Sequence, residues 1–236
     1  MHDISLSAFF PCYNEDLNLE SLVLEAIQVL TPLVQEFEIL IINDGSTDKT
    51  GLIAERLGKQ HEFLRVIHHE NNRGYGAALI SGFSHCVHEW VFFTDGDNQF
   101  LVSEIALLLQ EVDDHDLIIG YRKERKDPWH RILYGRAWTR FVQLLFGLKF
   151  RDINCAFKLI RRSTIDGLTL HASGAVINTE LLVKTTLGGA RIKQLAVSHR
   201  PRMFGKQTGG NLSVIFIAFK ELFRLWRELE RREMGF

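Results

Sequence analysis

Two carboxylates and a side-chain amide, Asp95, Asp97 and Gln99, follow a short apolar segment of the chain. Residues 90–94 of that segment are all aromatic or β-branched, a composition typical of a buried strand. In an open α/β sheet, ligands bind just beyond the carboxyl ends of strands. Hard oxygen ligands at that place suit a divalent cation such as Mg²⁺ or Mn²⁺, particularly one shared with a substrate phosphate. Asp-Gly and Asn also form ordinary turns, so the motif alone leaves a metal site and a plain turn both open.

Three further polar loops occupy comparable positions earlier in the chain. Each follows an apolar segment typical of a strand and precedes apolar residues at helical spacing. Because the strands of such an alternation run parallel, all four loops should meet at one edge of the sheet. Independent solvated turns would have no reason to converge there. The three loops comprise residues 11–15, 43–48 and 71–78, after strands predicted at 4–10, 37–42 and 64–67.

The alternation predicts an α/β fold with a doubly wound, mostly parallel sheet flanked by helices. The turn at Gly74–Gly76 is not a complete G-x-G-x-x-G motif, because Leu79 holds the third position, and no P-loop pattern is present. Neither a nicotinamide-dependent nor an ATP-hydrolysing function is therefore favoured. Further strands are expected at 90–94, 116–120 and 191–199, and helices over about 19–30, 103–112, 129–148, 178–187 and 211–232.

Composition narrows the class of protein. The chain has 236 residues, 46% of them hydrophobic, and a formal net charge of −1, so no global positive field favours nucleic acid as a partner. Its three cysteines are scattered and odd in number, which favours buried thiols in a reducing, cytoplasmic compartment. No basic segment precedes the first predicted strand, and the longest apolar run, 214–219, is far too short to span a bilayer. We expect a soluble or peripheral protein.

Positive charge is concentrated in one segment. Residues 122–151 contain nine Lys or Arg against two acidic residues, and over 129–148 these are interleaved with aromatic and aliphatic side chains. This pattern is typical of an amphipathic helix at an anionic membrane surface, with a solvated packing helix as the alternative. The predicted C-terminal amphipathic helix has mixed charge, so packing on the domain, homodimer formation and lipid contact all remain open for it.

Taken in order, the four loop motifs resemble the family 2 inverting glycosyltransferases of the GT-A fold. Within that family they are most similar to the polyprenyl-phosphate sugar synthases, such as dolichyl-phosphate mannose synthase. The resemblance extends to about Gly210 and implies a nucleotide-sugar donor, linked to UDP or GDP. It also implies which residues hold that donor. Pro11, Tyr13, Glu15 and Asp44 would hold the base and ribose, Asp95 the ribose or sugar, and Asp97 with Gln99 the metal ion, with Gly74, Arg122 and Lys206 as further donor contacts.

The resemblance also covers two acceptor-side segments. Residues 151–159 are similar to a family segment that begins with Asp and ends in Ser-Gly-Phe-Arg, which makes Asp152 the catalytic candidate. A hydroxyl acceptor would need Asp152 as a general base, whereas an ionised phosphate acceptor would need it only to orient the acceptor or an arginine. Residues 199–208 are similar to the family's Arg-x-x-Gly-x-Ser-Lys loop. Arg202 would clamp phosphate there, and Lys206 could replace the missing lysine.

The expected organisation is one GT-A domain over 1–210, with a donor half over about 1–122 and an acceptor half over about 123–210. A helical extension over 211–236 follows. A polyprenyl phosphate is the favoured acceptor, and a glycan, protein or small-molecule hydroxyl is the alternative. A non-catalytic nucleotide-sugar binder is disfavoured by the intact acidic motif. A nucleotidyltransferase is disfavoured because its glycine-rich basic loop is absent after the first strand.

Overall fold

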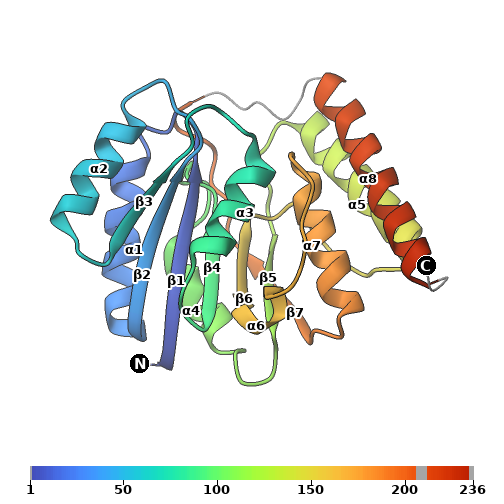
Figure 1. Ribbon diagram of the computed structural model, residues 1–236, viewed down its shortest axis with the longest axis horizontal. Helices are drawn as coiled ribbons and strands as arrows, with labels where there is room; N and C mark the ends of the chain where they lie inside the picture. The colour runs from blue at the N-terminus through green and yellow to red at the C-terminus, as the bar shows by residue number, and fades with distance from the viewer. Residues whose placement is uncertain (1, 206–211, 234–236) are drawn as a thin grey trace.

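A computed structural model of the chain describes residues 2–205 and 212–233. Its strands form one seven-stranded sheet in the order β3-β2-β1-β4-β6-β5-β7 (Figure 1). The strands are β1 (His2–Cys12), β2 (Val34–Asn43), β3 (Leu64–His68), β4 (Trp90–Thr94), β5 (Leu117–Arg122), β6 (Phe157–Arg161) and β7 (Ile192–Val197). The helices are α1 (Leu19–Leu33), α2 (Thr50–Gln60), α3 (Tyr75–His85), η1 (Val102–Glu104), α4 (Ile105–Leu109), α5 (Trp129–Phe146), α6 (Arg162–Ile165), α7 (Val176–Leu187) and α8 (Leu212–Glu233).

The predicted α/β class and the mostly parallel sheet are confirmed. Strand β6 is the exception, because it lies antiparallel between β4 and β5. No strand is predicted there from the sequence, in which Lys158 lies within a short apolar run. Inserting one antiparallel strand leaves β5 pointing the same way as β4. The carboxyl ends of β1, β2, β4 and β5 consequently meet at one edge.

The core is built from strands that are buried on both faces, as expected for a parallel sheet covered by helices. Every residue of β4 is buried, and Phe93 stacks on Phe9 of β1 with ring centroids 5.3 Å apart. Asp95 follows the last residue of this strand directly, and Asp97 lies two residues further on. The strand therefore fixes the start of the acidic loop.

Helices cover both faces of the sheet (Figure 1). On one face α1 packs with α2, and on the other α3 packs with α7. Helix α8, predicted from the sequence, packs on α7 and buries Leu222 and Leu225. Phe219 of α8 also meets Trp138 and Phe141 of α5, with ring centroids 5.8 and 5.7 Å apart.

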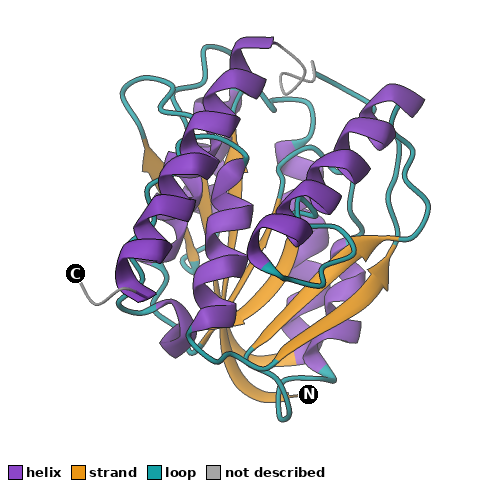
Figure 2. Ribbon diagram, turned by 90° about the vertical axis from the view of Figure 1, so that its right-hand side faces the viewer, coloured by secondary structure: helices purple, strands orange, loops and turns teal. Residues whose placement is uncertain are grey.

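Figure 2 looks at the side of the molecule that carries α5 and α8 and shows the helices standing in front of the strands. Helix α5 is a single helix of 18 residues, as predicted over about 129–148. Within residues 2–205 and 212–233, no helix combines the length and the apolar character needed to cross a membrane.

Candidate functional site

The loops after β1 and β2 are cross-linked at the carboxyl edge of the sheet. Asn14 adopts a left-handed backbone conformation, with φ 56°, which Asn tolerates better than most residues. Its Oδ1 accepts a hydrogen bond from Thr47 N at 2.8 Å, and Glu15 N donates to Thr50 Oγ1 at 2.8 Å. The first two polar motifs are thus one structural unit. Pro11 is buried at the end of β1, and the Tyr13 ring is 40% exposed, so it can meet a ligand at the edge.

Asp44 is buried, and both oxygens of its carboxylate have partners within the protein. Its Oδ1 lies 2.6 Å from His69 Nδ1 and accepts from Arg73 N at 2.9 Å. Its Oδ2 accepts from Gly74 N, also at 2.9 Å. These contacts place Asp44 beside the Gly74 turn, and its contact with the donor base stays a prediction. His69 is not among the residues predicted from the sequence, where its position just after β3 is the signal for it.

Asp95 and Asp97 converge in a buried, electronegative environment. Burial first, and then repulsion from Asp97, raises the pKa of Asp95 to about 7. Burial likewise raises the pKa of Asp97, although Arg202 opposes the rise. Asp95 Oδ1 and Asn98 Oδ1 are buried and have no hydrogen-bond partner among the described residues. A divalent cation beside the two carboxylates would relieve their mutual repulsion.

The protein supplies only part of a complete metal-ligand set. Among the side chains that the structure describes, no group of three or more His, Cys, Asp or Glu could hold a metal ion by itself. Asp97 contributes its carboxylate, and Gln99 keeps its Oε1 while its Nε2 donates to Arg200 O at 3.0 Å. The residues therefore fit a cation that takes its remaining ligands from a bound diphosphate.

Arg202 bridges the first and fourth polar motifs. Its Nη2 pairs with Glu15 Oε1, and its Nη1 lies 3.1 Å from Asp97 Oδ2. The loop that carries it is docked on the acidic loop, because Arg200 N donates to Gln99 O at 2.7 Å. Tertiary structure thus brings Arg202 to the edge predicted from the sequence. Lys206, the other predicted cation of this loop, lies outside the described residues.

Asp152 and Arg122 form a buried ion pair beside the acidic loop. Arg122 Nε donates to Asp152 Oδ2 at 2.6 Å and its Nη2 donates to Asp152 Oδ1 at 2.8 Å. Although burial opposes the effect, Arg122 holds the pKa of Asp152 below its ordinary value. Arg122 and Arg125 also face Asp127, at 3.7 and 2.9 Å. A carboxylate held in this way can orient an arginine but is a weak base.

Lys158 lies fully buried beneath the site, which the sequence analysis did not anticipate. Its Nζ donates to Cys155 O and, at 2.7 Å, to Asn178 Oδ1 at the start of α7. Burial lowers its pKa to about 8. The sequence signal was a single cation inside an apolar run, which is expensive to bury unless it is paired. Lys158 ties the turn after Asp152 to α7.

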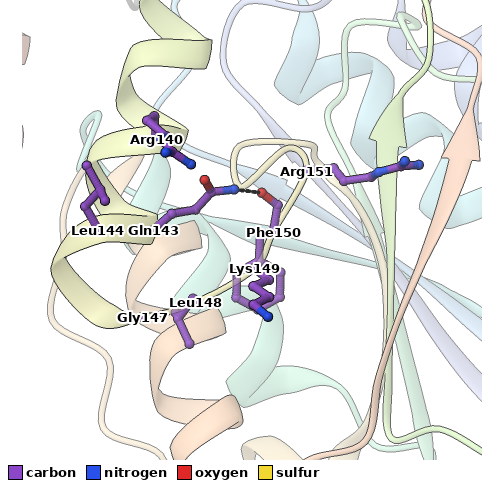
Figure 3. Close-up of a pocket in the computed structure, with 8 residues that line it drawn as sticks. All are labelled: Arg140, Gln143, Leu144, Gly147, Leu148, Lys149, Phe150 and Arg151. Atoms are coloured by element: carbon purple, nitrogen blue, oxygen red, sulfur yellow. Dashed lines mark hydrogen bonds between the residues drawn. The ribbon is translucent and has the colours of Figure 1, made fainter.

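Two cavities open beside the ion pair. One, of about 250 Å³, is lined by Tyr121, Arg122, Lys123, Glu124, Arg125, Ile132, Gly135, Arg136, Thr139, Arg151 and Asp152. Its lining has five basic and two acidic side chains. The other, of about 410 Å³, lies between the end of α5 and residues 147–151 (Figure 3). It combines apolar Leu144, Leu148 and Phe150 with cationic side chains. Arg151 lines both cavities.

A model of the family described as "Glycosyl transferase family 2" matches residues 7–169, which contain the second half of β1 and all the strands from β2 to β6. The chain belongs to glycosyl transferase family 2. The protein is therefore a glycosyltransferase, as the resemblance carried by the four loop motifs predicts.

Solved structures with the same fold include glucosyl-3-phosphoglycerate synthase from Mycobacterium tuberculosis. In complex with Mn²⁺, uridine diphosphate and glucosyl-3-phosphoglycerate, that protein has a TM-score of 0.68 and 20% identity, over 95% of this glycosyltransferase and 76% of that chain. Its complex with Mn²⁺, UDP-glucose and phosphoglyceric acid gives 0.69 and 21%, over 94% and 78%. A complex with Mg²⁺ and uridine diphosphate gives 0.66 and 21%, over 95% and 76%. The GT-A fold assignment is thereby confirmed.

Proposed function

We propose that this protein transfers a sugar, with inversion, from a nucleotide-sugar donor to the phosphate of a polyprenyl phosphate at an anionic membrane surface. The donor is held at the carboxyl edge of β1, β2 and β4, with Tyr13 and Glu15 toward the nucleoside. The linked base, uracil or guanine, is left open by these contacts. The solved structures of the same fold bind uridine diphosphate with Mn²⁺ or Mg²⁺, which supports a nucleoside diphosphate and a divalent cation here.

Asp97 and Gln99 are the metal ligands in this proposal, and Asp95 faces the ribose or sugar. The cation neutralises negative charge that develops on the departing nucleoside diphosphate. Arg202 pairs with Asp97 and Glu15 in the structure, and its planar guanidinium suits phosphate oxygens equally well. We infer that Arg202 contacts the pyrophosphate when the donor binds.

The cavity beside the Arg122–Asp152 pair is the observation that carries the acceptor assignment. Arg122 and Arg125 are balanced by Asp152 and Asp127. Among the side chains that the structure describes, no carboxylate pairs with Lys123, Arg136 or Arg151. An anion such as a phosphate monoester matches this uncompensated charge. A phosphate is already largely ionised at neutral pH, so it attacks the anomeric carbon without a strong base. This agrees with the pairing of the Asp152 carboxylate with Arg122, which makes it a weak base.

The surface around this cavity suits a lipid. Large apolar side chains stand exposed on α5, including Trp129 (76% exposed) and Leu144 (71%), and Phe216 and Phe223 are exposed on neighbouring α8. Arginines lie on the same helices. Aromatic and cationic side chains on adjacent helices are typical of an interface with anionic headgroups. The amphipathic cavity in Figure 3 could receive the first apolar units of a lipid acceptor whose phosphate lies beyond Arg151.

Transfer assays with the full chain test the proposal. The chain is incubated with UDP- and GDP-sugars, Mn²⁺, and vesicles that contain polyprenyl phosphate. We expect nucleoside diphosphate release that depends on the lipid phosphate, and a sugar product of inverted configuration. If no donor yields nucleoside diphosphate, the glycosyl-transfer proposal is overturned. If the product is pyrophosphate instead, the protein is a nucleotidyltransferase.

Vesicle co-sedimentation tests the membrane part separately. We expect binding to anionic but not to neutral vesicles, and weaker binding in the Trp129→Ala and Leu144→Ala variants. Leu52→Ala is the matched control, because Leu52 is 74% exposed but lies on α2, at the opposite end of the molecule (Figure 1). Equal losses in all three variants, or no binding by the original chain, would argue against the lipid surface.

A second candidate acceptor is a small phosphorylated acid, whose hydroxyl would receive the sugar. The basic cavity would fit its phosphate, and the similar synthase from Mycobacterium tuberculosis is described with phosphoglyceric acid. That reaction needs a general base, for which the arginine-bound Asp152 is poorly suited. Transfer to phosphoglyceric acid without vesicles would favour this candidate.

A further inference from the structure

The turn at residues 172–174 is in direct contact with the glycine turn of the donor edge. Gly76 N donates to Ser173 O at 2.7 Å. A side chain on Gly76 would overlap the carbonyl of Ala172, and a Cβ on Gly74 would lie 2.8 Å from Ser173 O. The two glycines therefore permit a backbone-to-backbone approach that any other residue would block. The position of Ser173 and the conformation of the glycine turn are fixed together.

Helix α8 holds the same turn from its other side. Glu221 Oε1 accepts from Ser173 N at 2.8 Å and from Ser173 Oγ at 2.7 Å. These are charge-assisted hydrogen bonds to one oxygen of a partly buried carboxylate. A second carboxylate, Glu180 of α7, holds the preceding residue, because Glu180 Oε2 accepts from Ala172 N at 2.9 Å. The turn is suspended between α7, α8 and the donor edge.

Beyond the glycine turn, the contacts continue to Asp44. Its two oxygens accept from Arg73 N and Gly74 N, at 2.9 Å each, so the carboxylate grips the start of the turn. Hydrogen bonds, together with the backbone of residues 74–76, thus connect Glu221 through Ser173 to Asp44. These contacts span the whole distance from α8 to the loop after β2.

We propose that Glu221 is a positioning residue for the donor site. By fixing Ser173, it sets the glycine turn in the conformation that receives the nucleotide sugar, so α8 contributes to donor binding without touching the donor. The inference rests on the proposed function, because it needs a nucleotide-sugar donor that meets Gly74, as the family resemblance implies.

Glu228 provides a matched control on the same helix. It pairs with Lys184 of α7, with Nζ and Oε1 3.2 Å apart. Lys184 also donates to Thr169 O at 2.6 Å and to Glu180 Oε1 at 2.7 Å, so it keeps two partners when Glu228 is changed. Glu228→Ala removes one negative charge from α8, as Glu221→Ala does, but it takes away the contact with Lys184 and leaves Ser173 held.

The test measures the affinity of full-length variants for uridine and guanosine diphosphate with Mn²⁺ by calorimetry, together with the donor KM and kcat. We expect Glu221→Ala to weaken nucleotide binding and raise the donor KM between tenfold and about a hundredfold, with a smaller change in kcat at saturating donor. Glu221→Gln, which retains an acceptor oxygen, should restore most of the affinity. Glu228→Ala should bind like the original chain.

Unchanged affinity in a folded Glu221→Ala variant would overturn the inference. Equal weakening in Glu228→Ala would do the same, because it would trace the effect to general packing of α8. If Glu221→Ala does not fold, Ser173→Ala is measured instead, because it removes only the hydroxyl contact. The inference is overturned if Ser173→Ala binds nucleotide with unchanged affinity and Glu221→Gln does not bind it as the original chain does. Failure of the proposed function would look different, because the original chain itself would then bind neither nucleotide.

Discussion

Asp152 and Arg122 are joined by two parallel hydrogen bonds, Nε to Oδ2 at 2.6 Å and Nη2 to Oδ1 at 2.8 Å. The pair is buried, and both residues line the basic cavity beside the acidic loop. The sequence analysis left open whether Asp152 is a general base or an orienting group. The geometry favours the second role, because the carboxylate is paired on both oxygens.

The first prediction concerns this pair. If Asp152 acts through Arg122, then Asp152→Asn and Arg122→Lys should each lower kcat/KM, and the double variant should be little worse than the poorer single variant. The pH dependence of kcat should keep its shape in Asp152→Asn. A general base would behave differently. Asp152→Asn would then lose about 10²–10⁴ in kcat while Arg122→Lys stayed near the original value. Thermal unfolding controls for the cost of disturbing a buried pair.

The second prediction concerns the metal. Asp97→Ala should weaken Mn²⁺-dependent binding of the nucleoside diphosphate more than tenfold, since it removes the charged ligand. Gln99→Ala should have a smaller effect, because it removes a neutral ligand and the bond to Arg200 O. Removal of metal with a chelator should abolish transfer and leave the fold intact. Calorimetric titration of Mn²⁺ into each folded variant, with and without nucleotide, makes the comparison. Unaltered Mn²⁺ dependence in Asp97→Ala would remove this residue from the metal site.

The third prediction concerns Arg202, which pairs with Asp97. If Asp97 is a metal ligand, Arg202 competes with the cation for it in the absence of a donor. Arg202→Met should therefore tighten Mn²⁺ binding to the nucleotide-free chain. The same substitution should lower kcat/KM, because the guanidinium no longer reaches the pyrophosphate. The two effects have opposite signs, which a merely destabilised protein would not reproduce. Weaker Mn²⁺ binding to the nucleotide-free variant would contradict the competition.

The fourth prediction concerns Lys158. Because burial lowers its folded-state pKa to about 8, the unfolded chain binds more protons than the folded chain between about pH 8 and its ordinary pKa. Stability should therefore rise with pH in that window, relative to Lys158→Met, by at most about 3 kcal/mol. Urea unfolding of both chains at pH 7 and pH 10 measures the difference, in which groups shared by both chains cancel. A difference that stays constant with pH would mean that Lys158 titrates normally.

Local sequence determined much of this protein. The run Trp90–Thr94 is aromatic or β-branched throughout, which is typical of a buried strand, so the position of Asp95 at its end could be predicted. Four such strand-to-loop junctions in alternation with helices fixed the class of fold and the edge where the loops meet. These features depend on residues that are close together in the chain, which is why they could be predicted.

Tertiary structure decided the contacts between distant residues. Strand β6 enters antiparallel because β4 and β5 each offer it an edge, and its own short run, interrupted by Lys158, gave no sign of this. The contacts of Asp44 with His69 and with the amides of Arg73 and Gly74 could not be predicted from the sequence, because these residues lie 25 to 30 positions away in the chain. Pairs such as Arg122–Asp152 and Ser173–Glu221 lie 30 and 48 residues apart. The sequence identifies the charged and polar groups, but only the tertiary structure determines which of them remain available to a ligand. The physical reason is that an oxygen or N–H group already hydrogen-bonded within the protein has fewer sites left for a ligand.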